Sequence, residues 1–190
     1  EIVLHDKKKR RVINIITYDF SDITETNHMY HGNLKELIVK VQCESDFKGI
    51  SDDVAGISGT AFFINQKGNL LTNNHVVEGC KVSKIKYFNK EYEANLISTD
   101  KTLDLALLKV DLKPKSFISF SKKEPRKRQL VIIAGYPLGE YLSDDLKINE
   151  GKISSLKGFE NNSNEITVDL AINPGNSGGP IVDENGQLVA

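Results

Sequence analysis

The sequence is most informative at residues 173–180, which run Asn173-Pro174-Gly175-Asn176-Ser177-Gly178-Gly179-Pro180. Glycines on both sides of Ser177 predict a turn that presents one hydroxyl group and lets another backbone approach it closely. A serine hydroxyl is a weak nucleophile at neutral pH, so a reactive serine has to be exposed and surrounded by N–H groups that stabilise an oxyanion. We therefore interpret this segment as the site of a nucleophile. An ordinary turn between two strands is the alternative.

A serine nucleophile needs a general base, and His75 is the only histidine within an apolar, strand-like pattern, Leu70 to Val77. A single histidine in such a pattern is usually satisfied by a hydrogen bond in the core. In combination with the serine turn, we interpret His75 as the base.

The base in turn needs a carboxylate that fixes its tautomer and stabilises the imidazolium. Asp104 directly precedes the apolar run 105–108, whereas the competing Asp100 belongs to a looser turn. We select Asp104 because the strand expected after it would fix its direction.

Short runs of apolar and β-branched residues, separated by turn residues, predict strands along most of the chain. The expected strands are 36–43, 59–65, 69–77, 82–88, 91–98 and 105–110, then 130–135, 146–156, 165–171, 179–183 and 187–190. Helical periodicity is nowhere sustained. The pattern therefore predicts an all-β chain of two packed antiparallel barrels or sandwiches.

The two groups of strands define the expected domain organisation. We expect an N-terminal arm at 1–33, a first unit at 34–112 with His75 and Asp104, a basic connector at 113–128, and a second unit at 129–190 with Ser177. The second group is one strand short of the first, so we expect it to be truncated at its C-terminal end.

Five motifs occur in an order that is typical of one protease family. They are Ser58–Ile64, Thr72–Val77, Asp104–Lys109, Gly135–Gly139 and Asn173–Pro180. In these motifs the chain resembles HtrA/Deg-type trypsin-like serine proteases over about residues 34–190, with the His, Asp, Ser order of the chymotrypsin-like class. The resemblance implies two Greek-key β-barrels of the chymotrypsin type and a serine endopeptidase that hydrolyses peptide bonds of unfolded proteins through an acyl-enzyme.

The resemblance also assigns roles to individual residues. It implies His75 as general base, Asp104 as its orienting carboxylate and Ser177 as nucleophile, with the oxyanion hole in the Gly175-Asn176-Ser177 backbone, from the N–H groups of Gly175 and Ser177. Digestive enzymes of this fold have an aspartate where Asn176 stands, and that aspartate pairs with a newly cut N-terminus. The resemblance therefore implies that ordering of the loops around Gly175 sets the activity. It further implies a homotrimer and an extracytoplasmic, periplasmic location.

The residue six positions before the nucleophile lies at the base of the primary pocket in trypsin-like folds, and here it is Ala171. A pocket without charge would leave a basic side chain buried and unpaired. We expect cleavage after Val, Ala or Ile and poor cleavage after Lys or Arg. Asp169 is the competing determinant, because strand alternation puts it on the same face as Ala171.

Composition excludes several other classes of function. A formal net charge of −1 gives no overall field for nucleic acid, and no apolar run approaches the roughly 18–20 residues of a membrane span. No metal or other cofactor is expected, because His28 and His31 lack the i, i+4 spacing of two helical ligands. Cys43 and Cys80 are too few for a four-ligand metal cage, and the sequence leaves open a disulfide or two thiols.

Two other functions remain as alternatives. A catalytically silent chaperone or peptide-binding module would keep the fold without turnover. A serine esterase would use the same triad, but its nucleophile elbow joins a strand to a helix, whereas Ser177 is followed by strand-like residues.

Overall fold

The computed structural model describes residues 2–6, 11–16, 34–44, 58–136, 145–170 and 172–190. Its strands are β1 Ile2–Asp6, β2 Arg11–Ile16, β3 Ile38–Glu44, β4 Ser58–Phe63, β5 Asn69–Thr72, β6 Val82–Tyr87, β7 Lys90–Asp100, β8 Leu105–Val110, β9 Leu130–Gly135, β10 Lys147–Ser155, β11 Thr167–Val168 and β12 Ile181–Val182. Its helices are η1 Leu34–Glu36, α1 Asn74–Val77 and η2 Phe159–Asn161. The predicted all-β class is confirmed, and no helix within the described residues is long and apolar enough to cross a bilayer.

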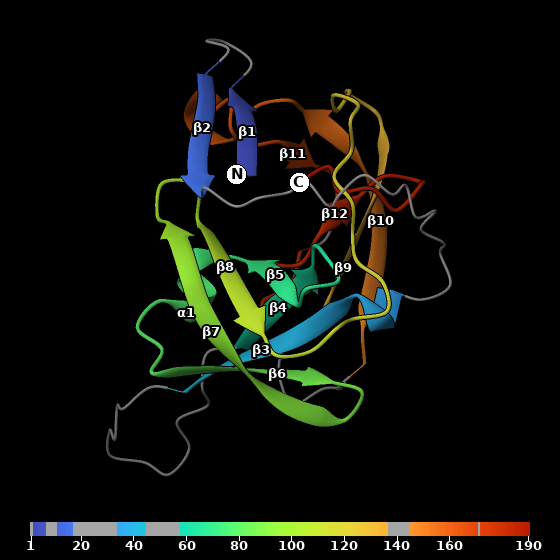
Figure 1. Cartoon of the computed structure of the whole chain (residues 1–190). Coiled ribbons are helices and arrows are strands. Elements are labelled where there is room, and N and C mark those ends of the chain that lie inside the picture. The colour runs from blue at the N-terminus through green and yellow to red at the C-terminus, as the bar shows by residue number, and fades with distance from the viewer. Residues whose placement is uncertain (1, 7–10, 17–33, 45–57, 137–144, 171) are drawn as a thin grey trace, which may run out of the picture.

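Six strands close into a barrel in the order β3-β4-β5-β8-β7-β6, in which β6 returns to β3 (Figure 1). Each pair of neighbours is antiparallel. β5 lies beside β8 although β6 and β7 come between them in the chain, and this order, β5-β8-β7-β6, is that of a Greek key. Closure leaves no free edge in this sheet.

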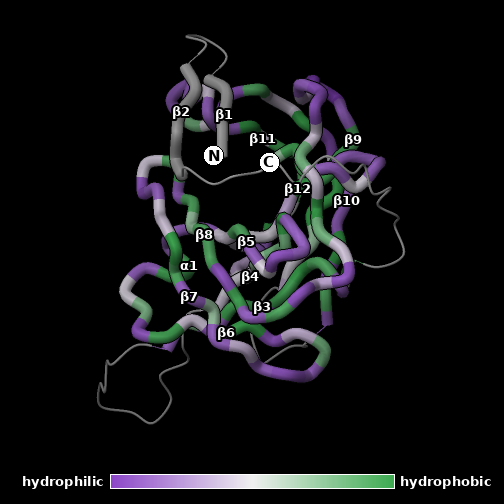
Figure 2. The backbone as a smooth tube through the Cα atoms, in the orientation of Figure 1, coloured by the Kyte–Doolittle hydropathy of each residue, from purple (hydrophilic) through white to green (hydrophobic). Residues whose placement is uncertain are grey.

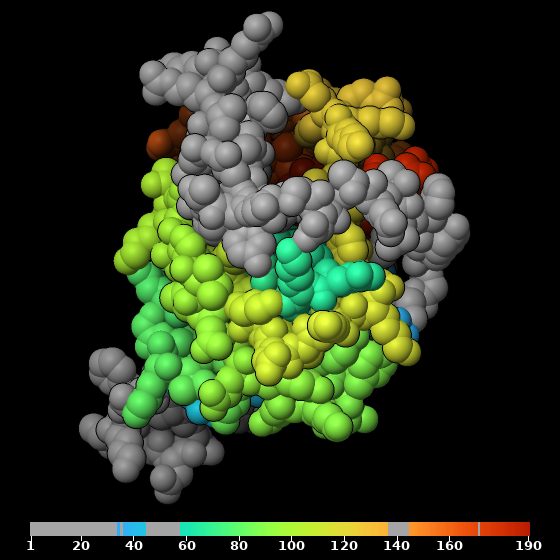
Figure 3. Space-filling model, viewed as in Figure 1, coloured from blue at the N-terminus to red at the C-terminus, as the bar shows by residue number. Residues whose placement is uncertain are grey.

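The second group of strands forms a four-stranded sheet in the order β11-β10-β9-β12. In the described residues this sheet is open and not a closed barrel. β9 lies at its centre and pairs with β10 on one side and β12 on the other. Figure 3 shows barrel residues, in green to yellow-green, over the lower half of the molecule and orange and red residues of the second sheet above them.

Neighbouring residues on the barrel strands pack into two different cores. Phe63 and Leu108 fill the barrel interior, while Phe62 and Leu107 pack on the other side of the same strands with Ile132 of β9. Strands that are buried on both faces carry continuous apolar runs, and Figure 2 shows such hydrophobic stretches along β3 and β8. The second core joins the open sheet to the barrel.

The prediction of a strand at 69–77 is wrong for the second half of that range. β5 ends at Thr72, and residues Asn74–Val77 form α1. The N–H groups of Asn74 and His75 donate to the carbonyl and carboxylate oxygens of Asp104, at 3.1 and 2.9 Å. Because these two N–H groups bond to Asp104, they do not bond to a neighbouring strand, and the strand ends before them.

Two strands predicted near the C-terminus are also overestimated. Within the described part of the range 165–171, which is 165–170, Thr167–Val168 form a strand, β11. At 187–190, Leu188 makes isolated bridges to Phe120 and Val182. Isolated bridges at a single residue do not make a strand, so 187–190 is not one.

Near the N-terminus, β1 and β2 pair as an antiparallel hairpin, drawn in blue in Figure 1. The interpretation of 1–33 as an arm and the boundaries of the two units stay predictions.

A disulfide joins Cys43 of β3 to Cys80, which follows α1 closely. The Cα atoms of the two cysteines are 5.3 Å apart, within the usual range for such bonds. The N–H of Lys81 also donates to the carbonyl of Glu44 at 2.8 Å. The segment that follows α1 is therefore fastened to β3 by a covalent bond and a hydrogen bond.

We expect the disulfide to stabilise the fold. Reduction, or the double change Cys43→Ser and Cys80→Ser, should lower the free energy of unfolding by about 2–4 kcal/mol, because the unfolded chain regains loop freedom. Denaturant titration with and without reductant measures this difference, and the double variant is the control that should not respond to reductant. The expectation would be contradicted if the wild-type protein, with both thiols shown to be reduced, unfolded at the same denaturant midpoint as the oxidised protein.

Candidate functional site

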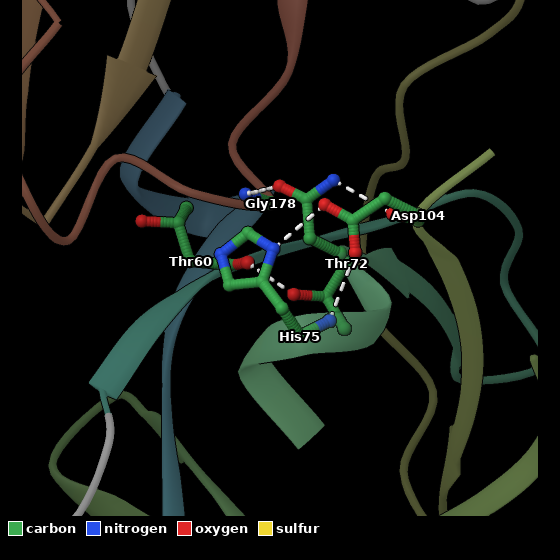
Figure 4. A network of polar contacts seen from close by, with 6 residues as sticks. Thr60, Thr72, His75, Asp104 and Gly178 are labelled. Atoms are coloured by element: carbon green, nitrogen blue, oxygen red, sulfur yellow. Dashed lines mark hydrogen bonds and ion pairs between the residues drawn. The ribbon is translucent and has the colours of Figure 1, made fainter. Parts of the chain in front are cut away.

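His75 and Asp104 form the centre of the site. His75 lies in α1, and Asp104 lies in the turn between β7 and β8. Nδ1 of His75 is 2.6 Å from Oδ2 of Asp104, and the two side chains point toward each other in Figure 4. Since a carboxylate only accepts, it holds the proton on Nδ1 and leaves Nε2 as the basic nitrogen. The side chains are 53% and 43% exposed, so an incoming molecule can reach the pair.

The backbone of Asp104 is held in an unusual conformation, with φ at +51°. Its carbonyl accepts hydrogen bonds from the N–H of Asn74 and from Nδ2 of Asn73, at 3.1 and 2.8 Å. Its carboxylate accepts from the N–H and the ring of His75. A left-handed backbone is disfavoured for a residue with a Cβ, and it persists where surrounding bonds over-determine it. Four hydrogen bonds from one short segment, 73–75, hold Asp104 in this conformation.

The competing carboxylate, Asp100, has a different contact set. Its Oδ1 accepts the N–H groups of Thr102 and Leu103 at 2.8 and 2.9 Å. These are the contacts of an aspartate that shapes a turn. Asp104 is the carboxylate that contacts the imidazole.

An exposed ion pair fastens the same turn to the end of α1. Nζ of Lys101 is 2.6 Å from Oε1 of Glu78. The hydrogen bond to Glu78 and its charge raise the pKa of Lys101. Exposed pairs of this kind contribute little to stability.

Three successive carbonyl groups of the serine turn are each held by a hydrogen bond. The carbonyl of Gly175 accepts from Oγ1 of Thr60 at 2.8 Å, and that of Ser177 accepts from the N–H of Thr60 at 2.8 Å. Between them, the carbonyl of Asn176 accepts from the N–H of Gly179 at 2.8 Å. The first barrel therefore fixes the turn from both sides of residue 176.

Some backbone N–H groups of the serine turn donate a hydrogen bond within the protein, and others do not. The N–H of Asn176 donates to the carbonyl of Asn173 at 3.1 Å. Those of Gly175 and Ser177 have no acceptor among the described residues. Backbone N–H groups without an internal acceptor are available to bind an oxyanion.

The serine turn meets the His75–Asp104 pair through one side chain, that of Asn73. Its Oδ1 accepts the N–H of Gly178 at 2.5 Å, and its Nδ2 donates to Asp104. No hydrogen bond among the described residues joins the Ser177 hydroxyl directly to His75. Such bonds are often long without substrate and tighten only in the complex.

Gly178 fits this position only because it lacks a side chain. A Cβ there would lie 2.2 Å from the carbonyl oxygen of Thr60 and from Oγ1 of Thr72. The φ of Gly178 is +81°, a conformation that glycine adopts without strain. Figure 4 shows Gly178 beside the two threonines.

Sequence reasoning assigned no role to Thr60, Thr72 or Asn73. Thr60 and Thr72 are 0% and 1% exposed, and Oγ1 of Thr72 donates to the carbonyl of Thr60 at 2.7 Å. Oγ1 of Thr60 also accepts the N–H of Tyr136 at 3.0 Å. The sequence signal for the two threonines is a hydroxyl group within an apolar strand pattern. Such a hydroxyl is expected to be buried, and a buried polar group requires a hydrogen-bond partner.

One predicted site residue, Ala171, lies outside the described residues, so the pocket assignment stays a prediction. His28 and His31, which were not expected to bind a metal, also lie outside the described residues. Asp169 is described, and its Oδ1 accepts the N–H of Lys152 on β10. Within the described part of the chain, no cluster of three His, Cys, Asp or Glu residues is suited to a metal ion.

Residues 59–190 match a family described as "Trypsin-like peptidase domain". The chain is 35% identical over 136 residues to a DegP-like periplasmic serine endoprotease of Marinomonas, covering 69% of this chain and 28% of the relative. It is 35% identical over 153 residues to the serine protease Do-like HtrA of Bacillus subtilis, covering 73% and 34%. The chain thus spans 21% to 34% of the length of the curated relatives.

Solved structures show the same relationship. The serine endoprotease from Yersinia pestis superposes with a TM-score of 0.66 at 28% identity, covering 81% of this chain and 52% of that one. The HtrA-type protease AlgW, solved with a tripeptide, superposes with a TM-score of 0.67 at 29% identity, covering 81% and 49%. The predicted chymotrypsin-type fold is therefore confirmed.

Substitution of Asp104 and of Asp100 should have different effects on the reactivity of Ser177. Asp104→Asn should slow labelling of Ser177 by a fluorophosphonate probe by about 10⁴-fold, because the imidazole loses its required tautomer. Asp100→Asn, the matched control, should change the labelling rate only a few-fold. The reverse ranking of the two variants would show that the wrong carboxylate has been selected.

Proposed function

The chain belongs to the trypsin-like peptidase domain family, and from this premise we propose that it is a serine endopeptidase of the HtrA/Deg type. The observation that carries the proposal is the His75–Asp104 contact of 2.6 Å, which Asn73 connects to the turn that contains Ser177. The activity, substrates and partners of the whole protein are part of the proposal.

In the proposed reaction, Asp104 holds His75 with its proton on Nδ1. Nε2 takes the proton of the Ser177 hydroxyl as the serine oxygen attacks the peptide carbonyl. The negative oxygen of the tetrahedral intermediate accepts hydrogen bonds from the N–H groups of Gly175 and Ser177. The imidazolium then gives its proton to the leaving amine, and an acyl-enzyme remains.

The second half of the cycle uses water as the nucleophile. His75 takes a proton from the water as it attacks the acyl group, and returns that proton to the Ser177 oxygen when the ester bond breaks. The sum is hydrolysis of one peptide bond, and Ser177 regains its hydroxyl. The acyl group passes from the leaving amine to Ser177 and then to water, and His75 moves the protons, so the proposed reaction needs no metal or other cofactor.

Control of the activity is proposed to depend on ordering of the turn around Gly175. Asn176 is 4% exposed, and its Oδ1 has no hydrogen-bond partner among the described residues. An amide tolerates this position at less cost than an unpaired carboxylate would. An ion pair with a new N-terminus is therefore not part of the proposed control.

We also propose unfolded proteins as substrates and an extracytoplasmic, periplasmic location. The half-exposed His75–Asp104 pair supports access by an extended chain. The Cys43–Cys80 disulfide is of a kind that persists in oxidising compartments, and several relatives are named as periplasmic. A homotrimer stays a prediction from the resemblance.

Removing the nucleophile tests the proposed function. Ser177→Ala should lower turnover of unfolded casein by roughly 10⁶-fold, the scale found when a triad serine is removed, and should abolish fluorophosphonate labelling. Thermal unfolding should show a folded variant. Casein cleavage that survives in this variant would refute the assignment, and a wild type that neither labels nor cleaves would favour a silent binding module.

The primary pocket is proposed to have Ala171 at its base and to select small aliphatic side chains. A basic side chain would be buried there without a partner. Mass-spectrometric mapping of cuts in unfolded casein should show a majority after Val, Ala or Ile. Asp169→Ala is the control and should leave this profile unchanged, since that carboxylate binds the N–H of Lys152. A majority of cuts after Lys or Arg would contradict the proposal.

A further inference from the structure

Asn73 contacts both of the loops that carry the proposed catalytic residues. Its Nδ2 donates to the carbonyl of Asp104 at 2.8 Å, and its Oδ1 accepts the N–H of Gly178 at 2.5 Å. It also lies two positions before His75 in the chain. One carboxamide therefore connects the segments of the base, of the orienting carboxylate and of the nucleophile. Figure 4 shows Gly178 and Asp104 at the two sides of this network.

Helix capping does not explain this asparagine. Asn73 occupies the N-cap position of α1, where an asparagine oxygen normally accepts an N–H from the first turn. Its side chain makes no such bond. Both ends of the carboxamide bind other segments of the chain instead.

The bond to Gly178 completes the fixation of the peptide group that follows the nucleophile. The carbonyl of that group, from Ser177, accepts the N–H of Thr60 at 2.8 Å, and its N–H, from Gly178, donates to Asn73. With both ends held, the group cannot rotate without breaking a hydrogen bond. Gly178 is buried, so its N–H would lose a partner that water does not readily replace.

The bond to Asp104 fixes the other side of the site. The Asp104 carbonyl has two donors, the N–H of Asn74 and the Asn73 side chain. Loss of the side-chain donor leaves the backbone of a residue with positive φ held by fewer bonds. The carboxylate of Asp104 is carried by this backbone.

We propose that Asn73 is a positioning residue that sets the geometry of Ser177 relative to the His75–Asp104 pair. This inference rests on the proposed function. The side-chain hydrogen bonds of Asn73 go to Asp104 and Gly178, and it acts through the two peptide groups that it binds. Because proton transfer from serine to histidine depends on their separation, an error of about 1 Å in that separation costs about 100-fold in rate.

The test compares the kinetics of Asn73→Ala with those of a matched variant. Asn73→Ala should lower kcat about 100-fold and slow fluorophosphonate labelling to a similar extent, with KM within about threefold of wild type. A residue that only stabilises the fold would not produce this division between kcat and KM at a temperature where the variant is fully folded.

Asn65→Ala is the matched control. Like Asn73, Asn65 makes two side-chain hydrogen bonds to backbone groups: its Oδ1 accepts the N–H groups of Lys67 and Asn69 at 2.9 and 3.2 Å, in the turn between β4 and β5. Its removal should lower stability without lowering kcat. Asn73→Asp retains an oxygen for Gly178 but turns a carboxylate oxygen toward the Asp104 carbonyl, and two acceptors repel each other. Its kcat should therefore also fall well below that of wild type.

The outcomes separate the inference from the proposed function. An active wild type with an equally active Asn73→Ala variant would overturn the inference alone, as would equal losses of kcat in Asn73→Ala and Asn65→Ala. A wild type that is neither labelled at Ser177 nor able to cleave casein would overturn the proposed function, and the inference with it.

Discussion

Packing on both faces of β3, β4, β5 and β8 is the constraint on which the rest of this structure depends. One face of these strands fills the barrel, and the other carries Phe62 and Leu107 against Ile132 of the second sheet. Burial of this second apolar face drives the sheet onto the barrel. Residues that are far apart in the chain, such as Thr60 and Ser177, are thereby brought into contact.

Polar groups buried between the barrel and the second sheet fix the position of the serine turn. Thr60 and Thr72 are buried where the serine turn meets the barrel, and each hydroxyl has a backbone partner. Buried polar groups tolerate few arrangements, because a buried group left without a hydrogen bond costs more free energy than a made bond contributes. The apolar core thus brings the two units together, and the polar network selects one alignment of the serine turn.

Much of the fold and of the site was predictable because local patterns carry it. Apolar runs located the barrel strands, and the glycines around Ser177 located the turn. The same reasoning extended one strand through His75, because nothing local shows that Asn74 and His75 donate to Asp104. The choice of Asp104 over Asp100 rested on a neighbouring strand, whereas the structure distinguishes them by contact with the imidazole.

The sequence by itself determined the all-β class, the family resemblance and the types of residue available for catalysis, since these follow from periodicity and from motifs of adjacent residues. Only the tertiary structure decided that Cys43 and Cys80 are bonded, that the second group of strands pairs in the order β11-β10-β9-β12, and that Asn73 connects Asp104 to Gly178. Each of these depends on the distance between groups that are remote in the chain. Burial sets that distance, and the order of residues along the sequence does not record it.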